Sequence, residues 1–231
     1  MKLQKLTSNI EAKRRRYDDA CAAAHAMDIL GERWAVPVMR ELMFGPLRFG
    51  ELRDAIPAIS ANILTQRLIG LEAAGVVRRY RLPSPASTPV YELTNWGYEA
   101  APIFQVMGRW GARSPAHDPQ RPFSPASLLL SFRTMMNAER AQGLTARIGF
   151  RLGQSDFLLE LDDGVAVPAR GSIADADLIF VGAPAAIAAA AYGGVPLREL
   201  EKQGAVTIEG NRELAERFVT LFPLPSKASS A

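Results

Sequence analysis

The sequence predicts a multidomain chain: a mainly α-helical domain with one β-hairpin, then an α+β domain with a mostly antiparallel sheet. Apolar residues recur at helical spacing through most of residues 18–111, whereas strand-like segments interspersed with helices follow residue 126. Residues 113–125 contain four prolines and no periodicity, which is typical of a linker. We therefore expect domains at 1–112 and 126–231, joined by a linker at 113–125.

Charge is distributed unevenly between the two expected domains. Residues 1–112 carry 15 Lys and Arg against 11 Asp and Glu, a net charge of +4, whereas residues 113–231 carry 12 against 13, a net charge of −1. A basic front half and a near-neutral back half indicate different partners for each. The basic run Lys13–Arg16 has two interpretations, a phosphate contact or a solvated surface.

Several classes of protein are disfavoured by composition. The N-terminus lacks the apolar run of a secretory signal, and glycines and a proline interrupt the most apolar stretch, Leu178–Gly194, so we expect no membrane span and a cytoplasmic protein. The single Cys21 excludes an intramolecular disulfide, and His25 and His117 are too far apart in sequence to suggest a zinc site. Because motifs for a catalytic nucleophile, a phosphate loop or a dinucleotide are absent from the sequence, we expect no enzyme activity, no cofactor and no metal.

Three helical segments open the first domain. Residues 21–30 and 34–42 carry apolar side chains at helical spacing. Gly45-Pro46 then predicts a turn, and residues 48–56 predict a short amphipathic helix ended by Pro57. A further helix follows after a short connection, so the arrangement is a helix-turn-helix.

That further helix, the centre of the domain, starts at Ser60. The Ser60 hydroxyl suits an N-cap, and Leu64, Leu68 and Leu71 recur at i, i+4 and i+7 as one apolar stripe. Small, uncharged or amide-bearing residues lie mostly off this stripe, where a wholly solvated face would more usually carry Glu and Lys. This pattern predicts a helix that reads the DNA major groove, with base-edge and backbone contacts. The candidate contact residues on this helix are Ser60, Asn62, Thr65, Gln66 and Arg67.

A basic β-hairpin is predicted next. Gly75 ends the helix as a left-handed residue, and residues 76–81 form a strand whose Arg78, Arg79 and Arg81 are candidate phosphate contacts. The proline-rich loop 82–89 leads to a second short strand, which completes a wing. Amphipathic helices followed by strands also occur in many enzymes, so this stretch alone leaves both interpretations open.

The last helix of the first domain is predicted from Asn95 to Gly111, capped by Thr94. It bears Trp96, Ile103 and Trp110 and is more apolar than a lone surface helix requires, which suggests a dimer contact. The whole layout is that of a winged helix-turn-helix.

Residues 21–111 resemble the HxlR-type transcriptional regulators, a branch of the MarR-like winged-helix proteins. The matching segments include Asp28–Trp34, Arg48–Leu52, Leu64–Leu68, Gly75–Val77 and Tyr91–Thr94. The resemblance implies a homodimer that binds a pseudo-palindromic double-stranded DNA operator, with the helix after Ser60 in the major groove and the hairpin along the backbone. Arg33 stands where the family usually has Lys.

The second domain is predicted as an α+β unit. Residues 145–152 and 156–161 read as strands, and Asp163-Gly164 predicts a tight hairpin to the next strand. Further strands are expected at 177–181 and 206–210. The expected helices are 128–141, 184–192, 196–203 and 212–222.

Residues 126–224 resemble the sterol-carrier-protein-2-like fold. The matching segments are Ala176–Phe180, Gly194–Leu197, Gly204–Asn211 and Leu221–Pro223. The resemblance implies a shell around an apolar tunnel, which in a regulator would hold a lipid-like or hydrophobic effector. Apolar side chains at strand and helix spacing are core residues by default, so a purely structural role stays open. The candidate lining residues are Phe150, Leu152, Phe157, Leu159, Phe180, Ile187 and Tyr192.

Cys21 occupies the position at which some HxlR-type proteins carry a redox-sensing cysteine. Such a role requires a lowered thiol pKa, from a helix N-terminus or cations, whereas Asp18 and Asp19 would raise it. A small buried hydrophobe is the alternative role.

The sequence thus predicts a DNA-binding regulator, a repressor with an apolar effector. The rival is a hydrophobic-ligand carrier whose first domain serves mainly for dimerisation.

Overall fold

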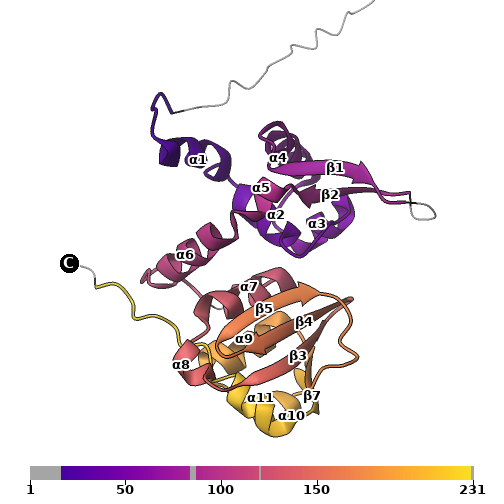
Figure 1. The fold of residues 1–231 in the computed structure, drawn as a ribbon, viewed down its shortest axis with the longest axis vertical. Coiled ribbons are helices and arrows are strands. Elements are labelled where there is room, and N and C mark those ends of the chain that lie inside the picture. Colours follow the sequence, from indigo (N-terminus) through magenta and orange to yellow (C-terminus); the bar gives the residue numbers. More distant parts are fainter. Residues whose placement is uncertain (1–16, 84–86, 120, 230–231) are drawn as a thin grey trace, which may run out of the picture.

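The protein was analysed as a computed structural model, which describes residues 17–83, 87–119 and 121–229. The predicted basic run Lys13–Arg16 lies outside these residues. The chain folds into a helical N-terminal part and a C-terminal part built on one sheet, with α6 and α7 between them (Figure 1). No helix in the described ranges combines the length and the apolar character that crossing a bilayer requires.

The N-terminal part is a winged helix-turn-helix, as predicted. Helices α3 and α4 form the helix-turn-helix, and β1 and β2 form an antiparallel hairpin that projects from it (Figure 1). The elements are α1 (Ala22–Leu30), α2 (Ala35–Leu42), α3 (Phe49–Ala55), α4 (Ala61–Ala73), β1 (Val77–Arg81), β2 (Pro89–Leu93), α5 (Asn95–Tyr98) and α6 (Ala101–Ala112).

The core of this part follows the apolar stripes expected from the sequence. Leu64, Leu68 and Leu71 of α4 are buried in one apolar cluster with Leu42 of α2 and Leu52 of α3. Gly75 has a φ of +75°, the left-handed conformation that ends α4 and turns the chain into β1. The apolar face of α4 is therefore fixed, and its opposite face points to solvent.

The C-terminal part has a five-stranded sheet in the order β5-β4-β3-β6-β7, antiparallel except between β3 and β6. The strands are β3 (Thr145–Leu152), β4 (Ser155–Asp162), β5 (Val165–Arg170), β6 (Leu178–Gly182) and β7 (Val206–Gly210). The helices are α7 (Pro125–Met135), α8 (Ala138–Ala141), α9 (Pro184–Gly193), α10 (Leu197–Lys202) and α11 (Arg212–Phe218). This confirms the predicted α+β class.

The turn between β4 and β5 is confirmed at Asp163-Gly164. Asp163 has a φ of +42° and Gly164 a φ of +85°, and Asp162 pairs with Val165 across the turn. Two successive positive φ angles match the twist of the flanking strands, which explains why the Asp-Gly pair predicts this hairpin.

Three predicted helices differ from the observed ones. The helix expected over 95–111 is divided into α5 and α6, because Pro102 lacks the N–H that would bond to the Tyr98 carbonyl and its ring would clash with that carbonyl. The helix expected over 128–141 begins earlier, at Pro125, and is divided at Asn137, whose side chain caps α8. The closing helix ends at Phe218 rather than 222, shortly before Pro223.

Candidate functional site

Helix α4 presents a polar face at its N-terminal half. The Ser60 hydroxyl accepts a hydrogen bond from the Ile63 N–H at 3.3 Å, so this side chain is used as the N-cap. Asn62 and Gln66 are exposed one turn apart, opposite the buried leucines. Their amide groups are thus free to meet an external partner.

Two other candidate contacts on α4 are engaged within the chain. The Thr65 hydroxyl donates to the Ala61 carbonyl at 2.9 Å, so its proton is not available to a base. The Arg67 guanidinium donates to Glu32 Oε2 at 2.9 Å, and its side chain is only 14% exposed. Arg67 therefore joins α4 to the connection before α2. The structure thus gives it a partner within the chain, whereas the sequence predicts that it contacts DNA.

The three hairpin arginines have different surroundings. Arg79 and Arg81 lie on one face of β1, because alternate residues of a strand share a face, and Arg78 lies on the other. The Arg78 guanidinium bonds to Glu92, its cross-strand neighbour, at 2.5 Å. This bond and the charge of Glu92 raise the pKa of Arg78. The positive charge of Arg78 is locally compensated.

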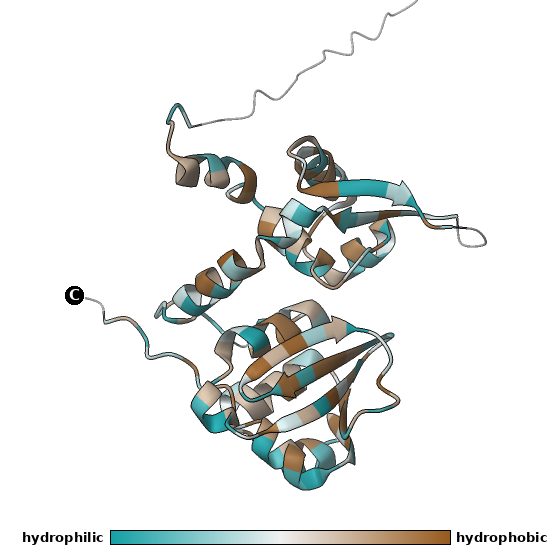
Figure 2. Cartoon of the chain, in the orientation of Figure 1, coloured by the Kyte–Doolittle hydropathy of each residue, from teal (hydrophilic) through white to brown (hydrophobic). Residues whose placement is uncertain are grey.

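Arg79 and Arg81 keep their charges uncompensated among the described residues. The Arg79 guanidinium lies 5.7 Å from the centroid of the Tyr91 ring, and Arg81 donates to the Ser87 carbonyl at 3.0 Å. β1 is hydrophilic along most of its length, in contrast to the strands of the C-terminal sheet (Figure 2). One face of the wing is thus a positively charged surface next to α4 in the sequence.

Cys21 is exposed at the N-cap position of α1, so the alternative of a small buried hydrophobe does not describe it. The N–H groups of Ala24 and Ala23 lower the pKa of its thiol. The net direction is opposite to the effect expected from Asp18 and Asp19.

The seven candidate ligand residues lie together in the core of the C-terminal part. Phe150, Phe157, Phe180 and Ile187 are fully buried between the sheet and the helices that cover it. The Phe150 and Phe180 rings stack with centroids 5.6 Å apart. Leu152 and Leu159 are also buried in this cluster, and Tyr192 packs against it.

Helix α7 supplies the ring that joins this cluster, and sequence reasoning missed it. Phe132 is fully buried and lies within 4.4–6.1 Å, between ring centroids, of Phe150, Tyr192, Phe218 and Phe222. The run of leucines before Phe132 was the available signal. Beside it, the Tyr192 hydroxyl donates to Ser131 Oγ at 2.7 Å, and burial raises the Tyr192 pKa.

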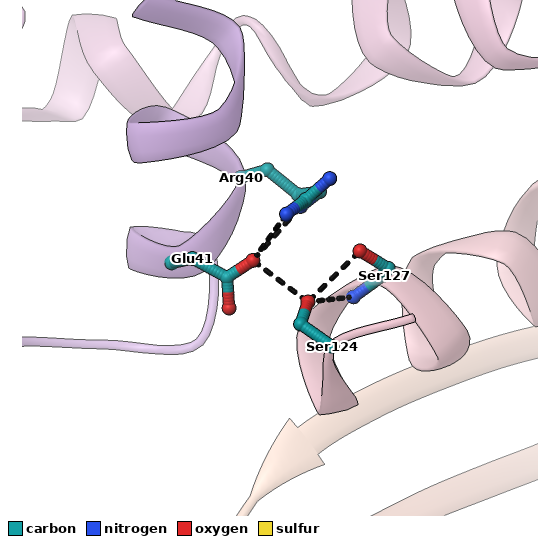
Figure 3. A network of polar contacts seen from close by, with 4 residues as sticks. All are labelled: Arg40, Glu41, Ser124 and Ser127. Atoms are coloured by element: carbon teal, nitrogen blue, oxygen red, sulfur yellow. Dashed lines mark hydrogen bonds and ion pairs between the residues drawn. The ribbon is translucent and has the colours of Figure 1, made fainter. Parts of the chain in front are cut away.

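The two parts of the chain meet through a buried carboxylate on α2. Glu41 is 3% exposed, and its Oε1 accepts hydrogen bonds from Arg40 at 2.7 Å and from the Ser124 hydroxyl at 2.7 Å (Figure 3). Ser124 also caps α7 by accepting from the Ser127 N–H at 3.0 Å. One serine thus links α2 of the N-terminal part to the first turn of α7.

An aromatic contact lies at the same boundary. Phe44, just after α2, packs its ring against Phe157 of β4 with centroids 5.5 Å apart and planes at 81°. Phe44 belongs to the N-terminal part of the chain yet packs against the C-terminal core. Local sequence patterns do not indicate these pairings, because the partners are more than 80 residues apart.

Comparison with known proteins finds a family model that matches each part. Residues 29–118 match the family model described as HxlR-like helix-turn-helix, and residues 129–223 match the SCP-2 sterol transfer family. The HTH-type transcriptional regulator YodB of Bacillus subtilis is 39% identical over 85 residues, 37% of this chain and 76% of YodB. The uncharacterized HTH-type regulator sll1512 of Synechocystis is 37% identical over 92 residues, 40% of this chain and 68% of that protein.

Solved structures of similar regulators cover the same part of the chain. The reduced form of YodB from B. subtilis covers 43% of this chain and all of its own, at 34% identity and a TM-score of 0.40. The redox regulator HypR in its oxidized form covers 39% of this chain and 94% of its own, at 32% identity and a TM-score of 0.37. The matches to sll1512 and YodB span more than two thirds of each relative's length, so this chain belongs to the HxlR-like helix-turn-helix family of transcriptional regulators.

Proposed function

We propose that the chain is a homodimeric transcriptional repressor whose α4 reads an operator and whose C-terminal core holds an apolar effector. One observation carries the proposal: α4 exposes the amides of Asn62 and Gln66, and the following strand carries Arg79 and Arg81, whose charges are uncompensated among the described residues. Amides recognise base edges, and arginines neutralise phosphates. Both kinds of contact are needed for sequence-specific binding.

Exposed apolar side chains support the homodimer. Helix α6 presents Ile103, Val106, Met107 and Trp110 to solvent, and the Trp110 side chain is 78% exposed. Met27 of α1 and Trp96 of α5 are exposed apolar side chains as well. A second copy of the chain would remove these groups from water.

An effector could act through α7, because this helix contacts both parts. Its Phe132 lies in the aromatic core, and its cap Ser124 bonds to Glu41 on α2, which packs behind α4. A ligand that enters the core and moves α7 would therefore displace α2. It changes operator affinity only if it favours one arrangement over the other.

The DNA contacts are tested by the salt dependence of binding in two matched variants. Arg79→Ala should weaken binding to all sequences and reduce the slope of log K against log salt by about one unit, since one phosphate contact is lost. Arg78→Ala should change the slope less, because Glu92 already compensates that charge. Gln66→Ala should instead relax sequence preference. Equal losses on operator and random DNA for Arg79→Ala and Gln66→Ala would contradict this division of roles.

Cys21 is proposed as an oxidant or electrophile sensor, on the basis of its exposure and the lowered pKa of its thiol. As the only cysteine of the chain it can be followed by alkylation rate against pH. The rate should reach its plateau at a lower pH than that of free cysteine. Coincident profiles would remove the proposal.

The carrier alternative rests on the SCP-2 match alone. Native mass spectrometry of the purified chain, together with a DNA-binding assay, distinguishes a carrier from a regulated repressor. A bound mass of lipid size without salt-dependent DNA binding would favour a carrier, and a bound mass with it would favour a regulated repressor.

A further inference from the structure

The outward face of α4 is apolar to a degree that the sequence stripe did not indicate. Ile63 is 41% exposed and Ile69 is 61% exposed, although both belong to a helix that buries three leucines on its other face. Asn62, Gln66 and Ile69 follow one another at i, i+4 and i+7, so their side chains share one face. Ile63 lies beside Gln66 at i+3 spacing.

Arg67, the one basic residue of α4, is withdrawn from this face. Its bond to Glu32 and its low exposure hold the guanidinium against the α1–α2 connection. Arginine and lysine are the side chains that most often recognise guanine, through its O6 and N7 atoms. The outward face of α4 therefore lacks the usual guanine-reading group.

Thr65 adds to the apolar character of the same face. Because its hydroxyl proton is donated to the Ala61 carbonyl at 2.9 Å, Thr65 has no donor left for a base, and its methyl is the apolar group it can offer. The face thus consists of two amides, Asn62 and Gln66, and three apolar groups.

We infer that α4 reads A·T base pairs, with the amides of Asn62 and Gln66 on adenine and the apolar groups of Ile63, Thr65 and Ile69 on thymine methyls. The inference rests on the proposed function, since it names the base pairs recognised by that same helix. Side-chain amides bond bidentately to adenine N6 and N7, and apolar side chains contact the thymine C5-methyl. Adenine and thymine occur in the same base pair, so the amides and the apolar groups of the α4 face select the same type of base pair.

The experiment begins with selection of duplexes from a randomised pool by the full-length protein. The selected half-site should contain consecutive A·T pairs at the positions protected by α4. Each thymine is then replaced singly by deoxyuridine, which removes only the C5-methyl. Wild-type affinity should fall about fourfold at each contacted position, the effect expected from one buried methyl group.

Two variants assign these losses to the isoleucines. Ile69→Ala and Ile63→Ala should each bind the thymine duplex more weakly and should lose the thymine–deoxyuridine difference at one position. Val165→Ala, which shortens an exposed valine on β5 of the other part of the chain, should keep every difference. Sedimentation of each variant checks that the oligomeric state is unchanged.

The inference is overturned by a selected half-site dominated by G·C pairs, by unchanged affinity on every deoxyuridine duplex, or by isoleucine variants that keep all differences. A change in oligomeric state in Ile69→Ala with retained methyl discrimination would assign this side chain to the partner copy instead. If no duplex binds in a salt-dependent way, the proposed function itself fails, which is a distinguishable outcome.

Discussion

Helices α4 and α7 begin alike but lie in opposite environments. Each starts at a serine whose hydroxyl accepts a hydrogen bond from an N–H in the first turn, Ser60 in α4 and Ser124 in α7. Helix α4 buries one stripe of leucines and exposes the other face. Helix α7 packs its buried side chains into the C-terminal core, and its other contacts are with α2 and α6.

The difference shows which residues of a helix carry information about partners. In α7 the surrounding elements determine the side chains, so Phe132 and Leu129 are explained by packing inside the chain. In α4 the outward side chains Ile63 and Ile69 are exposed and lie outside the buried core of the N-terminal part. A large apolar group such as Ile69 on that face therefore points to a partner outside the chain.

The largest expected effect concerns the buried side of α7. Phe132→Ala should reduce the free energy of unfolding by about 3–5 kcal/mol, because it removes the ring at the centre of the aromatic cluster and leaves a cavity. Urea unfolding, followed by near-ultraviolet circular dichroism, measures the change. A loss below about 1 kcal/mol would mean that the core collapses around the gap.

A smaller effect distinguishes the two serine caps. Ser60→Ala should cost about 1 kcal/mol, the usual loss for an N-cap. Ser124→Ala should cost about 2–3 kcal/mol, because it also removes a hydrogen-bond donor from the buried Glu41 carboxylate. The same urea titrations measure both values.

The matched control for the two caps is the double variant with Glu41→Gln. If Glu41 causes the difference, the effect of Ser124→Ala should shrink in that background, whereas the effect of Ser60→Ala should not change. Equal costs for the two single variants would show that the bond between Ser124 and Glu41 contributes nothing to stability.

The same contrast explains what the sequence could predict. The serine cap of α4, its leucine stripe and the Asp163-Gly164 turn are local features, in which neighbouring residues determine the backbone. The bonds from Arg67 to Glu32 and from Ser124 to Glu41 join residues 35 and 83 positions apart. Such pairings depend on how finished elements pack, so local patterns predict neither bond: they indicate Arg67 as a DNA contact, which stays a prediction, and they do not single out Glu41.

The smallest expected effect on stability is at the outward side of α4. Ile69→Ala should change the free energy of unfolding by no more than about 0.5 kcal/mol, since the side chain is largely in water in the folded chain. The adjacent Leu68→Ala should cost about 2–5 kcal/mol, because Leu68 is buried in the N-terminal core. Thermal and urea unfolding of the two variants give a direct comparison on one turn of one helix.

The change in the free energy of unfolding caused by Ile69→Ala distinguishes two explanations for the exposed side chain: a contact that folding requires, and a contact with DNA. A stability loss similar to that of Leu68→Ala would place Ile69 in a contact that folding requires, such as a dimer interface that forms with the fold. An unchanged stability together with weaker binding to thymine-containing duplexes would separate folding from recognition in this helix. An exposed isoleucine that folding does not need, and that is unfavourable in water, is then explained by the DNA that covers it.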